Sequence, residues 1–237
     1  MGLNGTEIKV AVASDFLTAF SRIPRKQQAK VLDFVNKFRT NPTLPGINYE
    51  KIEKWKDPKL RSVRIDQAYR GVVLKPEVGN VYVLLWVDHH DKAYQWAQNK
   101  VYHIHPETGS LQVVDVEEAQ IEEKTQAADA EIEEQGLFAG VRDRHLLKLG
   151  VPEILLPVVR RIKTEEDLDR VADKFPQEAS EALYLLAADY SVEETLRELE
   201  KSEVPATIDT DDFEKALENA DSKRRFFVVD DELELAA

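Results

Sequence analysis

The chain has 237 residues and no cysteine, which excludes disulfide bonds and cysteine-ligated zinc. Its formal net charge is −13, but residues 1–115 carry 17 Lys and Arg against 12 Asp and Glu, whereas residues 116–237 carry 15 against 33. Only the first half is therefore basic enough to meet phosphate. The sequence has no run of eighteen apolar residues and no secretory signal pattern, so we expect a cytoplasmic protein without a membrane partner.

The first fifty residues predict a strand followed by a helical hairpin. Residues 8–13 form a short apolar run, and Ser14 offers an N-cap for a helix over residues 16–21. Pro24 suits the first turn of a second helix, residues 24–39, whose apolar positions recur at helical spacing. Lysines and arginines occupy its other positions, which indicates either a solvated surface or one that faces phosphate.

Residues 51–61 interleave basic side chains with one aromatic ring. Such a segment can hold phosphate while the ring stacks on a base. The alternative is that the tryptophan packs under a sheet and the lysines are solvated. The candidates for nucleic-acid binding in this segment are Lys54, Trp55, Lys56, Lys59 and Arg61.

Residues 60–96 carry the strongest pattern in the chain. Val63 and Ile65 alternate with polar neighbours, residues 69–75 predict a second strand, and residues 81–87 predict a third that is apolar on both faces. The links 66–68 and 76–80 have hairpin length. We therefore expect an antiparallel meander, followed by a polar cluster at residues 88–94 where a short helix begins.

The rest of the chain predicts a change of architecture. Residues 101–105 and 111–114 predict strands, the second of them a last edge strand, and residues 117–135 are acidic and helical. Short helices follow to residue 220, with capping boxes at Thr164 and Ser191, and residues 225–229 predict a strand. The expected fold class is α+β: an antiparallel sheet with a helical hairpin in residues 1–115, an acidic helical linker at 116–135, and an acidic helical domain with a short C-terminal strand at 136–237.

The order of elements over about residues 7–105 resembles the RelE/ParE toxin superfamily. That family has a strand, a two-helix hairpin and then a three- or four-stranded antiparallel sheet, with an arginine-rich hairpin and a hydrophobic strand that ends in a His/Arg segment and a Tyr. Arg64 to Arg70 resembles the hairpin in the spacing of the HigB branch. His89 to Tyr94 resembles the terminal segment, with His90 where many members carry Arg.

Many members of this superfamily are toxins that cleave messenger RNA on the ribosome. The resemblance therefore implies a RelE-like fold, a place among toxin–antitoxin proteins, RNA and the ribosome as partners, and metal-independent endoribonuclease activity. It assigns the candidate site to the arginine-rich hairpin and the segment that ends at Tyr94.

The second half has a resemblance of its own. The segments LGVP (149–152), LPVVR (156–160) and DDFEKAL (211–217) resemble the region before the motor of certain UvrD/Rep-type superfamily 1 helicases, which carry a RelE-like domain at their N-terminus. These residues contain no GxxxxGK[ST] phosphate loop and so encode no ATP-driven motor. The resemblance implies a helicase motor domain as a partner and RNA or single-stranded DNA as the ligand.

Metal-independent cleavage of RNA requires cations that neutralise the phosphorane and a group that transfers a proton. Arginines could clamp the phosphate, an imidazole could transfer the proton, and a tyrosine could stack on a base. The catalytic candidates are Arg64, Arg70, His89, His90 and Tyr94, which we expect on one concave face with Lys54 or Lys56 at its rim. Because strand residues alternate between faces, only one of the two histidines is expected to point inward, and His90 is favoured.

No cofactor or metal is expected, because the pair His103 and His105 lacks obvious further ligands. Two hypotheses stay open. One is an endoribonuclease, and the other is a non-catalytic module that binds nucleic acid or protein beside a helicase motor. In either case the acidic half could serve as a spacer or as a phosphate mimic that covers the basic site.

Overall fold

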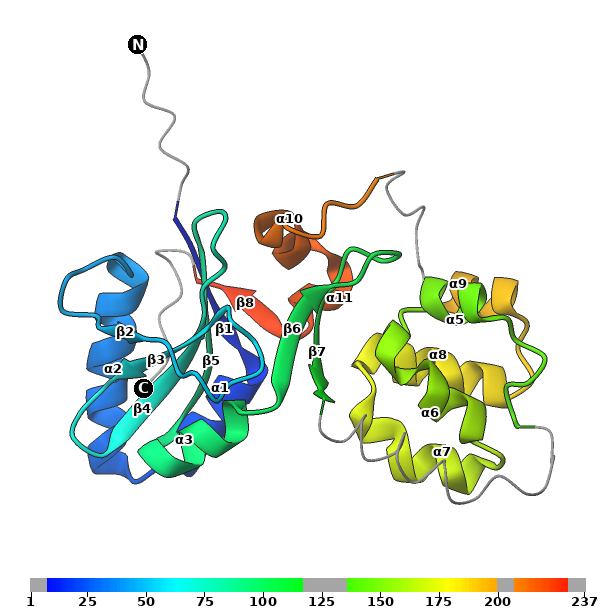
Figure 1. Ribbon diagram of the computed structural model, residues 1–237, viewed down its shortest axis with the longest axis horizontal. Coiled ribbons are helices and arrows are strands. Elements are labelled where there is room, and N and C mark those ends of the chain that lie inside the picture. The colour runs from blue at the N-terminus through cyan, green and yellow to red at the C-terminus, as the bar shows by residue number, and fades with distance from the viewer. Residues whose placement is uncertain (1–7, 117–135, 200–206, 230–237) are drawn as a thin grey trace, which may run out of the picture. The chain divides into compact units, whose positions relative to one another are not determined.

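The computed structural model describes residues 8–116, 136–199 and 207–229 (Figure 1). The chain forms two compact units, one of Met1–Tyr102 with Asp211–Ala237 and one of His103–Thr210. The first contains a mostly antiparallel sheet with a helical hairpin and the second contains short helices, which confirms the expected α+β class. None of the helices in these described ranges is both long enough and apolar enough to cross a bilayer.

The two units divide the chain differently from the expected domains 1–115, 116–135 and 136–237. Residues 117–135, nearly all of the expected linker, lie outside the described residues. At the other end, residues 211–229 return to the sheet of the first unit, whereas we had assigned them to the helical domain.

The first unit is built on a sheet with the strand order β2-β3-β4-β5-β1-β8. Its strands are β1 (Lys9–Ala13), β2 (Tyr49–Glu50), β3 (Leu60–Arg64), β4 (Tyr69–Leu74), β5 (Val81–His89) and β8 (Phe226–Val228). β3, β4 and β5 form the predicted antiparallel meander. β1 pairs with β5 in parallel, with Val10 opposite Tyr82, so β5 is a central strand between β1 and β4. Its residues 81–85 are all buried.

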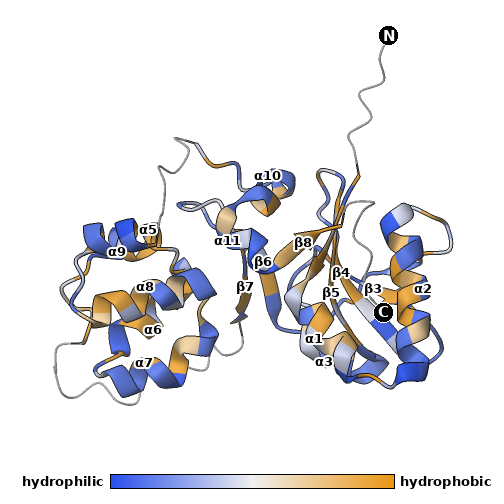
Figure 2. Cartoon of the chain, turned by 180° about the vertical axis from the view of Figure 1, so that it is seen from behind, coloured by the Kyte–Doolittle hydropathy of each residue, from blue (hydrophilic) through white to orange (hydrophobic). Residues whose placement is uncertain are grey.

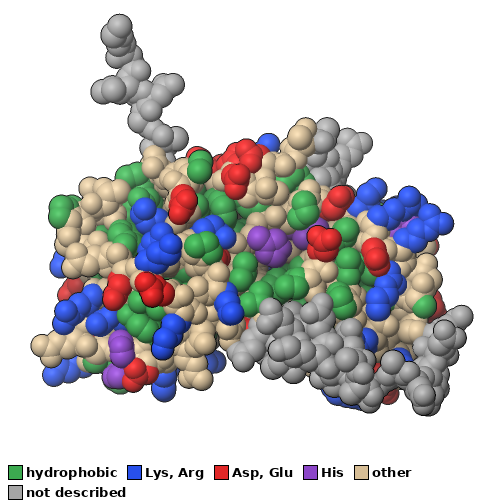
Figure 3. Space-filling view, viewed as in Figure 1, with side chains coloured by type: hydrophobic (Ala, Val, Ile, Leu, Met, Phe, Trp, Pro, Cys, Tyr) green, Lys and Arg blue, Asp and Glu red, His purple; other side chains and the backbone are tan. Residues whose placement is uncertain are grey.

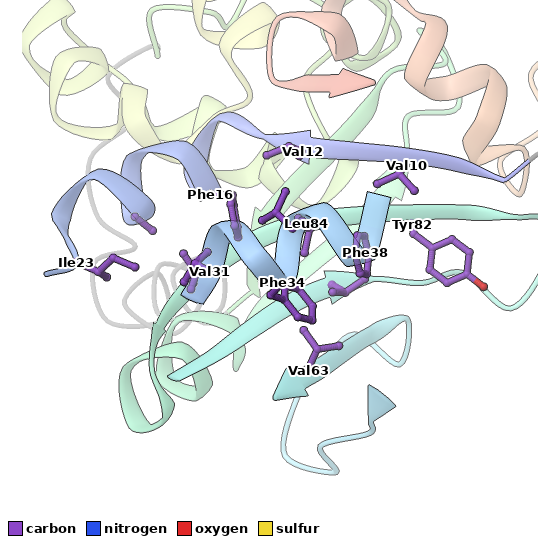
Figure 4. Close-up of a cluster of buried hydrophobic side chains, with 14 residues drawn as sticks. Val10, Val12, Phe16, Ile23, Val31, Phe34, Phe38, Val63, Tyr82 and Leu84 are labelled. Atoms are coloured by element: carbon purple, nitrogen blue, oxygen red, sulfur yellow. The ribbon is translucent and has the colours of Figure 1, made fainter. Parts of the chain in front are cut away.

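The helical hairpin consists of α1 (Ser14–Arg22) and α2 (Arg25–Thr40). The apolar stripe of α2 is buried against the sheet, as Figure 4 shows for Val31, Phe34 and Phe38 beside Val63 and Tyr82. Ser14 is the first residue of α1 and not its N-cap, because β1 runs directly into the helix and Ala13 takes the cap position.

Two elements follow the meander. α3 (His90–Ala97) starts where β5 ends, and its Trp96 stacks on Trp86 of β5 with ring centroids 4.8 Å apart. β6 (Lys100–Ile104) and β7 (Leu111–Asp115) form a separate two-stranded sheet. Residues 111–114 therefore form the expected strand, and in the described part of the chain it pairs with β6 in this small sheet and not with the main one.

The second unit contains the short helices α5 (Asp143–Lys148), η1 (Glu153–Leu155), α6 (Leu156–Arg161), α7 (Glu165–Val171), η2 (Ala172–Lys174), α8 (Gln177–Ala187) and α9 (Val192–Glu198). Both predicted capping boxes are present, at Thr164 and Ser191. Gly150 has a φ of 95° after α5, as expected for the residue that ends a helix in the left-handed conformation.

A buried polar cluster ties β7 to the helices of the second unit. Glu178 of α8 accepts hydrogen bonds from Ser110 Oγ (3.1 Å) and Gln112 Nε2 (2.9 Å), and Gln112 Nε2 also donates to the carbonyl of Gly150. All three side chains are buried. A buried carboxylate needs such donors, so this cluster fixes the hairpin in one register on the helices.

The C-terminal segment contributes α10 (Phe213–Glu218), α11 (Ala220–Lys223) and β8 to the first unit. β8 pairs antiparallel with β1, with Val12 opposite Phe227, and Lys9 forms ion pairs with Glu214 and Glu218. β1 and β5 are largely hydrophobic (orange) in Figure 2. The segment therefore covers an edge that β1 would otherwise leave open.

Candidate nucleic-acid interface

A tight hairpin, Arg64 to Arg70, joins β3 to β4 and is organised by the side chain of Asp66. This carboxylate accepts hydrogen bonds from the backbone N–H groups of Ala68 (2.8 Å) and Tyr69 (2.9 Å). An aspartate that binds the backbone just ahead of it closes a turn without glycine. Lys30 of α2 donates to the same carboxylate at 2.7 Å, so the hairpin is tied to the helical hairpin.

The environment of Asp66 keeps it ionised. Burial by itself would raise the pKa of this carboxyl group, but hydrogen bonds from Lys30 and from the backbone of Tyr69 and Ala68 outweigh it and lower the pKa from 3.8 to about 2. From the sequence, Asp66 was expected only to be part of the link between two strands. Its position at the start of a three-residue link was the signal for this role in the turn.

Arg64 and Arg70 are paired in register across the hairpin, so their side chains leave the same face of the sheet. Arg70 Nη1 donates to the carbonyl oxygens of Asp66 (2.9 Å) and Tyr69 (3.0 Å), and Arg64 Nε donates to the Asp66 carbonyl at 3.3 Å. Within the described ranges neither guanidinium forms an ion pair. The nearby carboxylates of Asp66, Asp88 and Asp91 thus form no ion pair with them.

The register of β4 and β5 separates His89 from the two arginines. His89 lies opposite Tyr69, and Asp88 lies opposite Arg70. Since successive residues of a strand point to opposite faces, His89 shares a face with Tyr69, while Asp88 shares the face of the arginines. This corrects the inclusion of His89 in one face with Arg64 and Arg70.

His90 is the first residue of α3, so the rule that successive strand residues point to opposite faces does not apply to it. Its backbone N–H donates to the carbonyl of Ala68 at 2.8 Å, which ties the helix start to the arginine hairpin. Its Nδ1 lies 2.7 Å from Asp91 Oδ1, and its ring centroid lies 4.9 Å from that of Tyr94, one helical turn later. A carboxylate on one imidazole nitrogen orients the ring and leaves the second nitrogen for proton transfer.

Five rings follow one another in this part of the first unit, and we call them the aromatic row: Tyr69, His89, His90, Tyr94 and Trp55. Consecutive ring centroids are 6.0, 6.3, 4.9 and 5.5 Å apart. Figure 3 shows histidine, acidic and basic side chains side by side at the surface in the region where Figure 1 places α3. The row thus offers partly exposed rings next to charged groups.

Trp55 closes the row from the inside and does not offer its ring to solvent. It is only 7% exposed, its Nε1 donates to the carbonyl of Tyr94 at 3.1 Å, and its ring packs edge-on against that of Tyr94. The alternative that the tryptophan packs under the fold therefore describes this residue. Its role is to support Tyr94.

The basic residues around Trp55 divide into two groups. Lys59 forms an ion pair with the buried Asp57 at 2.9 Å, and Arg61 donates to backbone carbonyls of its own segment. Lys54 and Lys56 are exposed. Of the five residues that we expected to bind nucleic acid, these two lysines are the ones whose side chains remain available at the surface.

A cleft of about 360 Å³ lies between α2, the loop that follows it and the end of β3. Lys30, Lys37 and Arg64 line it together with a single acid, Asp33, and its apolar wall is formed by Phe34, Leu44, Ile47 and Ile65. Lys30 is already paired with Asp66. Arg64 is the residue that this cleft shares with the arginine hairpin.

Of the two histidines that we had considered as a metal pair, His105 has a structural role. His105 is buried, its Nε2 lies 3.1 Å from the carbonyl of Val151, and its Nδ1 accepts from the backbone N–H of Thr108 at 3.2 Å. Both ring nitrogens are thus occupied.

Fold and site together define an α+β domain built from a strand, a helical hairpin and an antiparallel meander. In this domain, the β3–β4 hairpin with Arg64 and Arg70 lies beside the first turn of α3, which carries His90 and Asp91. No protein-family model and no curated protein matches the chain. Among solved structures, it is similar to a RelB–RelE antitoxin–toxin complex from Methanococcus jannaschii, with 14% identity over 36% of this chain and 95% of the matched chain and a TM-score of 0.30.

A second solved structure, an archaeal RelE–RelB complex from Pyrococcus horikoshii OT3, gives 18% identity over 36% of this chain and 98% of the matched chain, with a TM-score of 0.29. Similarity at this level does not by itself support a fold or an activity.

Proposed function

We propose that the chain is a nucleic-acid-binding module of RelE-like architecture that holds RNA or single-stranded DNA on its first unit. The observation that carries this proposal is the pair of guanidiniums at Arg64 and Arg70. They lie on one face of one hairpin, fixed by Asp66, and no carboxylate is paired with either in the described ranges. Cations held in place by backbone carbonyls are suited to phosphate, because binding displaces no internal ion pair.

The RelE-like architecture is supported by the order of elements. β1, the hairpin of α1 and α2, and the meander of β3, β4 and β5 follow the family's order, and α3 brings His90 and Tyr94 to the end of the last strand. The helicase relationship is supported by the sequence segments of the second half alone. On that basis we propose that the module belongs to the non-motor region of a UvrD-like helicase or of a relative, with the motor domain as its protein partner.

A second candidate function is metal-independent cleavage of RNA, with the ribosome as a partner, as in RelE-type toxins. The observation that favours it is the contact between His90 Nδ1 and Asp91 Oδ1, which holds the imidazole in the orientation of a general acid or base. In this alternative Arg64 and Arg70 neutralise the phosphorane, His90 transfers the proton, and Tyr94 stacks on a base.

Binding is tested with the full chain and fluorescently labelled single-stranded RNA and DNA of equal length. The double variant Arg64→Ala/Arg70→Ala should bind about tenfold more weakly or worse, and the slope of log K against log salt should fall by about 1 for each lost phosphate contact. The matched control is Arg142→Ala/Arg144→Ala, which removes the same charge from exposed positions of the second unit. Equal losses in both double variants would refute the proposal.

Cleavage is tested with labelled RNA and with translating ribosomes in the presence of EDTA. If the chain is a nuclease, His90→Ala should abolish cleavage and leave RNA binding within a factor of about three, because the arginines remain in place. RNA that stays intact with the wild-type chain under both conditions removes the second candidate. It leaves the binding module standing.

A further inference from the structure

Three consecutive side chains at the junction of β5 and α3 form a cluster of metal-ligating type. His89, His90 and Asp91 each offer one ligand atom, and the three atoms lie within 4.8 Å of one another. His90 Nδ1 and Asp91 Oδ1 are already 2.7 Å apart. In a tetrahedral zinc site with bonds of about 2.0–2.1 Å, neighbouring ligand atoms are about 3.3 Å apart. Two of the three atoms are thus near that spacing, and the third must approach by at most about 1.5 Å.

The backbone that carries these ligands is fixed on both sides. His89 is paired with Tyr69 in the sheet, and its N–H donates to Asp88 Oδ1 at 2.7 Å. The N–H of His90 donates to the carbonyl of Ala68. The metal would therefore need only rotations of side chains, with no loop to order, which keeps the entropic cost of forming the site small.

The side chains themselves are free to make this movement. His89 and Asp91 are exposed and His90 is partly exposed, so the approach needs no repacking. The rings of Tyr69 and Tyr94 flank the two imidazoles at 6.0 and 4.9 Å and limit how far each can turn away. The open side of the cluster leaves the remaining coordination positions to water, as in sites with three protein ligands.

We propose that His89, His90 and Asp91 bind one divalent transition-metal ion of the Zn²⁺, Co²⁺ and Ni²⁺ class. Two imidazoles and one carboxylate favour these ions over Mg²⁺ and Ca²⁺, which prefer all-oxygen sites. The start of α3 disfavours a cation only weakly compared with metal–ligand bonding. The sequence contains no thiolate that could compete for the metal.

The experiment is a calorimetric titration of the metal-free full chain with Zn²⁺, repeated with Co²⁺ and monitored by its visible absorption. We expect saturable binding of one ion per chain, undisturbed by a large excess of Mg²⁺. His89→Asn, His90→Asn and Asp91→Asn should each weaken binding about tenfold or more, because a chelate loses affinity when any ligand is removed. The control His145→Asn, at a partly exposed histidine of the second unit, should bind as the wild type does.

Three results would overturn this inference. The first is the absence of saturable binding, and the second is a double variant His89→Asn/His90→Asn that keeps the affinity of the wild type. The third is a loss confined to one variant, which would indicate a lone surface histidine and would equally refute a three-ligand site. Unchanged tryptophan fluorescence shows that each variant is folded. Because the assay contains no nucleic acid, its result is independent of the proposed function.

Discussion

Asp66 provides the sharpest test of how the arginine hairpin is built. The substitution Asp66→Asn keeps an oxygen that can accept from the N–H groups of Ala68 and Tyr69, but it removes the charge that Lys30 binds. We expect Asp66→Asn to retain the turn and to lose the dependence of stability on the ionisation of this group. The two proteins should therefore differ in the pH dependence of unfolding.

The magnitude follows from the pKa. A carboxyl group whose pKa falls from 3.8 to about 2 on folding stabilises the folded state by about 2 kcal/mol when it is ionised. Because the folded pKa is the lower one, this contribution is complete above the unfolded pKa near 4 and is lost as the pH falls toward 2. The Asp66 side chain is 17% exposed but that of Lys30 is 47% exposed, so screening by solvent and salt makes about 2 kcal/mol an upper value.

The assay is urea unfolding between pH 5 and pH 2, followed by tryptophan fluorescence. All three tryptophans of the sequence, Trp55, Trp86 and Trp96, lie in the first unit, so the signal reports this unit alone. Between pH 5 and pH 2, the free energy of unfolding of the wild type should fall by up to about 2 kcal/mol more than that of Asp66→Asn. Lys30→Gln should reduce the difference, because the Asp66 pKa then moves back toward its usual value. If the free energy of unfolding depends on pH in the same way for the wild type and Asp66→Asn, this explanation of the hairpin is refuted.

Three further substitutions test the packing. Gly71→Ala should destabilise the first unit by about 1–3 kcal/mol, since its Cβ would lie 2.9 Å from the buried Val63 side chain, and an unchanged urea midpoint would contradict this. Phe226→Ala should destabilise the same unit by about 3 kcal/mol, and a loss below about 1 kcal/mol would show that β8 is not part of its core. Gln112→Ala should cost about 1–3 kcal/mol in thermal unfolding followed by circular dichroism, because buried Glu178 loses a donor, whereas Gln177→Ala on the surface should cost little.

The local part of the fold could be predicted from the sequence. Some features depend only on residues within one turn or one strand of each other. They are the strand alternation in residues 60–65, the apolar run of β5 and the capping boxes at Thr164 and Ser191. The pairing partners could not be predicted in the same way. β1 carries nothing in its own five residues that selects β5 as a parallel neighbour and β8 as an antiparallel one.

The same distinction applies to the candidate site. The hairpin-length link 66–68 predicted that Arg64 and Arg70 lie across a tight hairpin from each other, and the register confirms that pairing. The face of the sheet to which His89 points depends on how β4 and β5 are aligned, and that alignment shifts between Val72 and Val73. No short sequence pattern encodes such a shift. The burial of Trp55 depends on α3, a helix forty residues later in the chain. That the full predicted set acts together on nucleic acid stays a prediction.

The division into units changes the electrostatic argument for nucleic-acid binding. Counted by sequence, residues 1–115 have a net charge of +5, but the first unit consists of residues 1–102 and 211–237, which together carry 21 Lys and Arg against 19 Asp and Glu. Two of the acidic residues in segment 211–237, Glu214 and Glu218, form ion pairs with Lys9. A unit with a net charge near +2 cannot attract a polyanion through its overall field. Binding must therefore depend on where cations are left unpaired, which is why the arginine hairpin, and not the count of basic residues, decides the proposal. A fragment of residues 1–115 would be more basic but would lack β8, so the full chain is the right object for the binding measurement.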